Sequence, residues 1–120
     1  MKKMIVIAED NNMLNRILEY RLKNDGYDVK VFINGEDAVS YMFGNPFDLL
    51  ITDLYMPLMN GMEVIQSVRD KISESIPIVA ISAAHEEELI NRVFNLGAND
   101  FIVKPFRAGE LSIRVKRLLE

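Results

Sequence analysis

Short, continuous apolar runs recur along the chain and alternate with segments of helical periodicity. Four of the runs lie at Met4–Ala8, Asp48–Thr52, Ile76–Ser82 and Phe101–Val103, and they lack the alternation of a strand with one face in solvent. Runs of this length that are rich in Val, Ile and Leu are typical of parallel strands covered on both faces. A weaker fifth run, Val29–Phe32, alternates apolar and charged residues, and we interpret it as an edge strand.

Stripes of apolar residues at helical spacing lie between these runs and predict five helices. The segment Ala38–Phe43 is the weakest of the five. Glycine follows the first, second and fourth helices, at Gly26, Gly44 and Gly97, where helices commonly end. Three glutamates, 86–88, open the fourth helix, where acidic side chains complement the positive end of the helix dipole. The four clear stripes are Leu14, Ile17, Leu18 and Leu22; Met62, Ile65 and Val68; Leu89, Val93, Phe94 and Leu96; and Leu111, Val115, Leu118 and Leu119.

Five strands alternating with five helices predict a (βα)5 chain, which is typical of a doubly wound α/β sandwich. The chain has 120 residues and shows no repeat, linker or low-complexity segment. This length suits one compact domain, so we expect residues 1–120 to form a single unit. Ligands of such folds bind beyond the carboxyl ends of the strands, which makes the residues that end each strand the ones to inspect.

Composition narrows the classes of function. The chain contains no cysteine, which excludes disulfides and thiolate metal sites and fits a reducing cytoplasm. The net charge is −4 and no basic stripe runs along the chain, so we do not expect this domain to bind nucleic acid directly. No apolar stretch approaches the roughly 20 residues of a membrane span, and the first run is too short for a signal peptide. We therefore expect a cytoplasmic protein without a membrane partner.

Charged or hydroxyl side chains end four of the five strands. The first strand ends in Glu9-Asp10, the third in Asp53, the fourth in Ser82 and the fifth in Lys104. Each of these residues alone is more often a turn, cap or surface residue than a functional one. Their coincidence at the ends of strands in one sheet is much harder to explain in that way.

Three carboxylates would converge if the first strand lies beside the third. Carboxylates so close to one another repel and therefore require a cation. Oxygen ligands without His or Cys favour Mg²⁺, with Mn²⁺ as an alternative. Lys104 and the Ser82 hydroxyl could contact the oxygens of a phosphoryl group. An Asp carboxylate in this setting can attack phosphorus and form an acyl phosphate. The pattern therefore indicates phosphoryl chemistry at Asp53.

The motifs at the strand ends resemble those of the receiver domains of two-component response regulators. They are Glu9-Asp10, the segment from Asp53 to Gly61 with Pro57 within it, Ser82-Ala83-Ala84, and Lys104-Pro105-Phe106. The resemblance covers the whole chain. It implies a flavodoxin-like fold with a parallel sheet of strand order 2-1-3-4-5.

The same resemblance implies a role for each site residue. Asp53 would accept the phosphoryl group from a histidine kinase or a phosphotransfer protein. Asp10, Asp53 and the backbone carbonyl of Tyr55 would bind Mg²⁺, and Glu9 would act through water. Ser82 and Lys104 would contact the phosphoryl group, and the peptide bond between Lys104 and Pro105 would be cis.

The resemblance also implies a switch rather than an enzyme. Phe101 would turn inward when Ser82 is drawn to the phosphoryl group, and the surface of the fourth helix, fifth strand and fifth helix would regulate an output domain or target protein. Asp100, Glu110 and Arg114 match charged positions used for dimerisation in one branch of the family, so a phosphorylation-dependent homodimer is among the expected assemblies. Ala84 cannot position water by hydrogen bonding, and the ring of Tyr55 lies close to the acceptor, so we expect slow autodephosphorylation.

Three other functions fit parts of the pattern. Magnesium-dependent aspartyl phosphohydrolases also use an Asp nucleophile and a Lys, but they place a second Asp where this chain has Tyr55. A nucleotide-binding domain would need a glycine-rich loop after the first strand, where this chain has Glu9 to Asn12. A degenerate receiver would bind proteins without phosphorylation, and the complete set of site residues argues against it.

Overall fold

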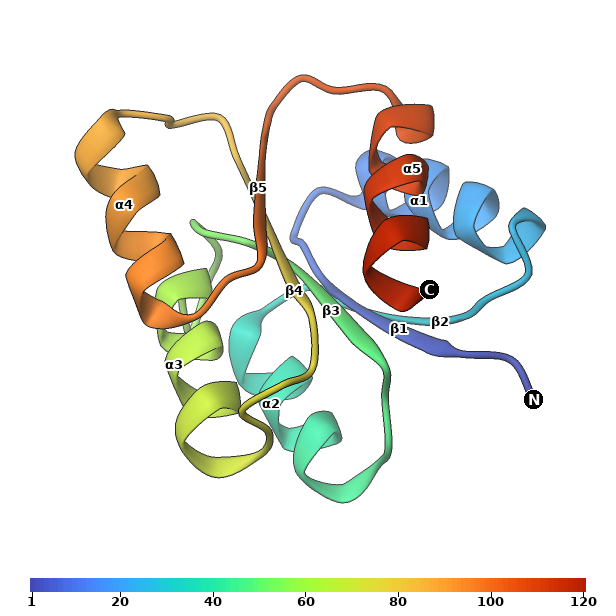
Figure 1. The fold of residues 1–120 in the computed structure, drawn as a ribbon, viewed down its shortest axis with the longest axis horizontal. Coiled ribbons are helices and arrows are strands. Elements are labelled where there is room, and N and C mark those ends of the chain that lie inside the picture. Colours follow the sequence, from blue (N-terminus) through green and yellow to red (C-terminus); the bar gives the residue numbers. More distant parts are fainter.

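The computed structural model describes all 120 residues as five parallel strands that alternate with five helices (Figure 1). The strands pair in the order β2-β1-β3-β4-β5, which confirms the expected order 2-1-3-4-5 and the flavodoxin-like class. The strands are β1 (Met4–Ala8), β2 (Asp28–Phe32), β3 (Leu49–Asp53), β4 (Ile78–Ser82) and β5 (Asp100–Val103). The helices are α1 (Asn12–Asn24), α2 (Gly35–Gly44), α3 (Gly61–Lys71), α4 (Glu87–Leu96) and α5 (Ala108–Leu119).

Helices cover both faces of the sheet, with α1 and α5 on one face and α2, α3 and α4 on the other (Figure 1). Each face has its own apolar core, because alternate side chains of the central strands point to opposite sides. Every residue of β3 and β4 is buried, as expected for strands covered on both faces. None of the five helices is long and apolar enough to cross a membrane.

The positions of β1 and β3 are the feature that matters most for the site. These two strands are direct neighbours, with Ala8 opposite Thr52, so their carboxyl ends lie side by side. β4 lies on the other side of β3, with Ile81 opposite Asp53. The loops that follow β1, β3 and β4 therefore meet at one edge of the sheet.

The structure corrects some of the predicted element boundaries. β4 begins at Ile78 rather than at Ile76, because Pro77 has no N–H to donate to the sheet. α2 is longer than predicted and includes Gly44, and Asn45 forms its C-terminal cap.

The predicted apolar stripe of α4 is only partly buried. Val93 is the one buried residue of this helix, and Phe94 is 42% exposed. The helix lies at the side of the molecule, beside α3 and the edge strand β5 (Figure 1), so a single row of side chains suffices to attach it.

Candidate phosphoryl-acceptor site

The turn between β1 and α1 holds Glu9 from several directions. The Glu9 side chain is fully buried, and its Oε2 accepts a hydrogen bond of 2.9 Å from the backbone N–H of Asn11. Its backbone carbonyl accepts a bond of 2.6 Å from the side-chain amide of Asn15, and its N–H donates to Phe32 of β2. Asn11 also caps α1 by accepting a hydrogen bond from Leu14 N–H. The first acidic residue is thus fixed by the start of the helix that follows it.

Asp53 ends the central strand β3 and is only 6% exposed. Its Oδ1 accepts a hydrogen bond of 2.8 Å from the N–H of Leu54, and its Oδ2 lies 3.2 Å from Nζ of Lys104. The hydroxyl of Thr52 donates to the Asp53 backbone carbonyl at 2.9 Å. The carboxylate is held in place while one side of it faces Lys104.

Lys104 directly follows β5, two strands away from β3, and connects Asp53 to Glu9. Its Nζ lies 2.6 Å from Oε1 of Glu9 and 3.2 Å from Oδ2 of Asp53. Burial alone would lower the pKa of Lys104, but the hydrogen bond to Glu9 and the nearby charges of Asp53 and Glu9 outweigh it and raise the pKa above its ordinary value. Lys104 therefore stays protonated as the single ammonium group between two carboxylates.

The three carboxylates that the strand ends predict lie together. Oxygen atoms of Glu9, Asp10 and Asp53 lie within 4.8 Å of one another, and the Asp10 side chain is exposed at the mouth of the cluster. Burial raises the pKa of Glu9 despite its bonds to Lys104 and Asn11, and the charge of Asp53 acts in the same direction. The site has more negative charge than Lys104 alone balances. An all-oxygen donor set with this surplus fits a hard divalent cation such as Mg²⁺.

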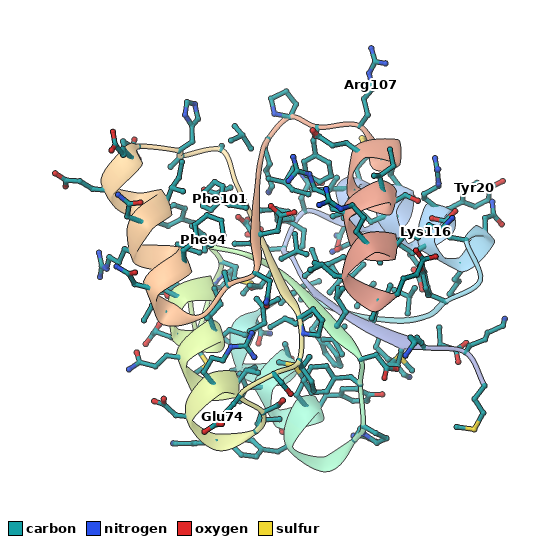
Figure 2. The ribbon with its side chains drawn as sticks, in the orientation of Figure 1. Tyr20, Glu74, Phe94, Phe101, Arg107 and Lys116 are labelled. Carbon is teal, nitrogen blue, oxygen red and sulfur yellow. The ribbon has the colours of Figure 1, made fainter.

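Ser82 and Phe101, to which the family resemblance gives the two parts of a switch, lie on the neighbouring strands β4 and β5. Ser82 is fully buried at the end of β4, and its Oγ accepts a hydrogen bond of 3.1 Å from Ala84 N–H. Its carbonyl accepts a bond of 2.9 Å from Lys104 N–H, which ties the ends of β4 and β5 together. The Lys104–Pro105 peptide bond is cis. Phe101 is half-buried and lies with Phe94 in the region between β5 and α4 (Figure 2).

Tyr55 lies in the loop between β3 and α3, and its side chain is 55% exposed. The loop is closed at its base by a 2.9 Å hydrogen bond from Gly61 N–H to the carbonyl of Leu54. A side chain at Gly61 would collide with the backbone of Asp53, because its first carbon would lie 1.9 Å from the Asp53 carbonyl oxygen. Glycine at this position lets α3 begin directly against the backbone of Asp53.

Several residues that shape the site were not singled out in the sequence. Asn11 and Asn15 orient Glu9, and Thr52 bonds the backbone of Asp53. An Asn just before an apolar helical stripe is a helix-cap signal, so Asn11 could have been found. Asn15 carries no such signal, because only the packing of α1 reveals that it is buried.

The charged residues expected on the output surface pair within the chain. Nη1 of Arg114 lies 2.8 and 2.9 Å from the two carboxylate oxygens of Asp100, and Nη2 lies 3.9 Å from Glu110. This pairing ties α5 to the edge strand β5.

Comparison with known proteins gives the class to which this fold and site belong. The family model of the response regulator receiver domain matches residues 5–116, and the chain belongs to this family. Its members are receiver domains of two-component signalling, which confirms the resemblance inferred from the strand-end motifs.

Individual relatives agree with this assignment. Transcriptional regulatory protein CrdR of Helicobacter pylori is 33% identical over 117 residues, which cover 98% of this chain and 55% of that protein. The chain thus spans about half the length of this curated relative. Chemotaxis response regulator CheY4 of Vibrio cholerae superposes with a TM-score of 0.93 at 25% identity, over 99% of this chain and 100% of that one.

A third relative has a metal in its site. The receiver domain of sensor histidine kinase PA1611 from Pseudomonas aeruginosa has a TM-score of 0.89 at 25% identity, with 99% and 98% of the two chains covered. In that structure a magnesium ion is coordinated in the active-site cleft.

Proposed function

We propose that residues 1–120 act as one phosphorylation-activated switch in the cytoplasm, in which Asp53 accepts a phosphoryl group from a histidine kinase or a phosphotransfer protein. The observation that carries this proposal is the environment of the Asp53 carboxylate. It is buried, lies 3.2 Å from Lys104 and belongs to a cluster with Glu9 and Asp10. A buried aspartate that served only the fold would not need two further carboxylates and a lysine converging on it from other strands.

The transfer itself needs little from the protein beyond position and charge. A carboxylate oxygen of Asp53 attacks the phosphorus of the donor and forms a new P–O bond. The bond between phosphorus and the donor's histidine nitrogen breaks, and the nitrogen keeps the electron pair. Lys104, which stays protonated, offsets the negative charge of the phosphoryl oxygens, and the Ser82 hydroxyl can donate to one of them.

Mg²⁺ is the cofactor that this site fits. Asp10, Asp53 and the backbone carbonyl of Tyr55 would hold it, with Glu9 acting through water. When bound, the ion would supply positive charge that balances the three carboxylates and stabilises the negative oxygens of the transferring phosphoryl group. The magnesium of the Pseudomonas aeruginosa receiver domain supports this choice, and Mn²⁺ is the alternative with the same ligand preference.

The output of the switch is a changed surface rather than a chemical product. A phosphoryl group on Asp53 favours the state in which the Ser82 hydroxyl leaves Ala84 and turns to the phosphoryl oxygens, and in which Phe101 moves inward. Ser82 ends β4 just before the loop that leads to α4, and Phe101 lies in β5. We therefore propose that the surface of α4, β5 and α5 binds the output domain or target, or a second copy of the chain.

Mass spectrometry of the intact protein tests the proposal. Wild-type protein and Asp53→Asn are incubated with acetyl phosphate, with and without Mg²⁺. We expect a gain of one phosphoryl group that requires both Mg²⁺ and Asp53. Beryllofluoride serves as a phosphoryl mimic if the adduct is labile. We also expect the adduct to persist for much longer than seconds after the donor is removed, because Ala84 cannot position an attacking water.

Two results would change the assignment. If neither reagent modifies the wild-type protein, the chain is a degenerate receiver that binds proteins without phosphorylation. If phosphate is released in repeated turnovers from a phosphomonoester, the chain is an aspartyl phosphohydrolase instead.

A further inference from the structure

The sequence gives β2 and α2 no part in the chemistry, since β2 ends without a charged or hydroxyl side chain. The structure nevertheless brings the start of α2 against the loop that carries Tyr55. Asn34 caps α2 by accepting a hydrogen bond of 2.8 Å from Asp37 N–H, and its side-chain amide donates to the Asp37 carboxylate at 3.0 Å. This double contact fixes Gly35 as the first residue of the helix, in a buried position.

Gly35 lies in direct contact with the backbone of the β3–α3 loop. A side-chain carbon built on Gly35 would lie 2.1 Å from the carbonyl oxygen of Met59 and 2.9 Å from the carbonyl carbon. It would also lie 2.7 Å from Cγ2 of Val64 in α3. Side-chain carbons do not approach other atoms so closely, and the Met59 carbonyl cannot swing away as the end of a flexible side chain could. The absence of a side chain is therefore what allows α2 and the loop to touch.

The part of the loop that Gly35 contacts adopts an unfavourable conformation. Leu58 has φ of 70°, in the left-handed region that leucine rarely adopts. Around it the N–H of Met59 donates to the carbonyl of Pro57 at 2.8 Å, which closes a three-residue turn. Such a turn persists only where its surroundings enforce it. The enforcing contacts are the first turn of α2 against Met59 and the hydrogen bond from Gly61 N–H to Leu54 at the base of the loop.

We propose that Gly35 is a positioning residue for the metal site. By seating the loop against α2, it holds the turn at Leu58 and so fixes where Tyr55, three residues earlier, presents the backbone carbonyl that we propose as a metal ligand. This inference rests on the proposed Mg²⁺-dependent function. It gives the weak edge elements β2 and α2 a role in the chemistry, and it makes Mg²⁺ affinity depend on a residue that is not a ligand.

The test compares Gly35→Ala with Gly44→Ala. Both substitutions lie in α2, but a side chain at Gly44 would meet no atom within 4 Å. Mg²⁺ affinity is measured by isothermal titration calorimetry, and thermal unfolding is measured separately in metal-free buffer. We expect Gly35→Ala to weaken Mg²⁺ binding about 10- to 100-fold, as is typical when the support of a metal ligand is removed. Gly44→Ala should bind Mg²⁺ as the wild type does.

The possible outcomes separate this inference from the proposed function. If Gly35→Ala melts at a lower temperature but binds Mg²⁺ with wild-type affinity, Gly35 is only a packing residue and the inference fails while the proposed function stands. If the wild type itself does not bind Mg²⁺, both fail.

A second pair of variants keeps the test valid if Gly35→Ala does not fold. Leu58→Gly removes the backbone strain of the turn and leaves the loop free to move away from an alanine at position 35. The double variant Gly35→Ala/Leu58→Gly is then compared with Leu58→Gly alone. Weaker Mg²⁺ binding in the double variant supports the positioning role, and equal binding overturns it.

Discussion

The loops on the two sides of Asp53 differ in how firmly the protein holds them. The loop between β1 and α1 carries Glu9 and Asp10, and it is fixed by hydrogen bonds from Asn11, Asn15 and Lys104. The helix that follows it has a side-chain cap and three buried residues. This side of the site is built to keep its geometry.

The loop between β4 and α4 has few such contacts. Apart from the first bond of α4 itself, its one hydrogen bond runs from Ala84 N–H to the Ser82 hydroxyl. The helix that follows begins at Glu87, its N-cap residue Glu86 makes no side-chain cap hydrogen bond, and Val93 is its only buried residue. Local opening requires little free energy where few contacts are lost, so α4 is the helix most easily displaced.

This difference assigns separate tasks to the two sides of one carboxylate. Under the proposed function, the β1–α1 side keeps the proposed metal ligands in place in every state of the protein. Under the same proposal the β4–α4 side responds when Asp53 is phosphorylated, and the hydrogen bond that the Ser82 hydroxyl would give up is its bond from Ala84 N–H in this loop. If Asp53 accepts a phosphoryl group as proposed, we expect the change to reach the surface through the less stable loop.

The largest expected effect on stability comes from removing the charge of Lys104, which pairs with Glu9 on the firmly held side. Lys104→Met leaves the buried carboxylates of Glu9 and Asp53 without their ammonium partner. We expect the metal-free protein to lose about 2–3 kcal/mol of its free energy of unfolding at neutral pH, less than for a fully buried pair because Lys104 is partly exposed. Urea unfolding in the presence of a chelator measures the loss. Lys23→Met breaks an exposed pair with Glu19 and serves as the control, with an effect below about 1 kcal/mol.

The pH dependence of this loss follows from the two pKa shifts. The pKa of Lys104 is raised, so its contribution is fully present below its ordinary value of 10.5 and disappears as the pH rises through the raised value. At low pH the contribution also shrinks, because Glu9, whose pKa burial raises above 4.5, takes up a proton and no longer needs a partner. The stabilities of wild type and variant should converge at both ends. A difference that stays constant with pH would show that Lys104 acts through packing.

A smaller effect is expected from the helix caps, because α1 has a side-chain cap and α4 has none. Asn11→Ala removes the hydrogen bond to Leu14 N–H and should lower the free energy of unfolding by about 1 kcal/mol. Glu86→Ala removes no cap bond and should change stability by only a few tenths of that amount. Equal losses in the two variants would contradict the difference between the loops.

Much of the fold and of the candidate site could be predicted from the sequence, because the apolar residues recur with the periodicity of strands and helices. Buried parallel strands leave long apolar runs, so the order of elements and the residues at the strand ends could be read directly. The convergence of Glu9, Asp10 and Asp53 followed from the expectation that β1 lies beside β3, which the register confirms. The strand order itself came from family resemblance, since periodicity does not order strands.

What the sequence could not reveal depends on contacts between distant elements. Phe94 fits the apolar stripe of α4 but is exposed, because how deeply a helix is buried is decided by its neighbours. Gly35 has an ordinary position at a helix start, and only the three-dimensional structure shows the Met59 carbonyl against it. Asn15 is similar, because its bond to the Glu9 carbonyl appears only when α1 packs on the sheet.

The smallest effect, and the sharpest test of the loosely held side, comes from giving α4 the cap that it lacks. Glu86→Ser places a hydroxyl where it can accept a hydrogen bond from the first turn of the helix, and we expect a gain of about 0.5–1 kcal/mol over Glu86→Ala. The gain should be local. Amide hydrogen exchange in the first turn of α4 should slow, while exchange in α1 stays unchanged. If the cap slows exchange throughout the protein instead, α4 does not open separately from the rest, and a signal from Asp53 could not pass through this loop by displacing α4 alone.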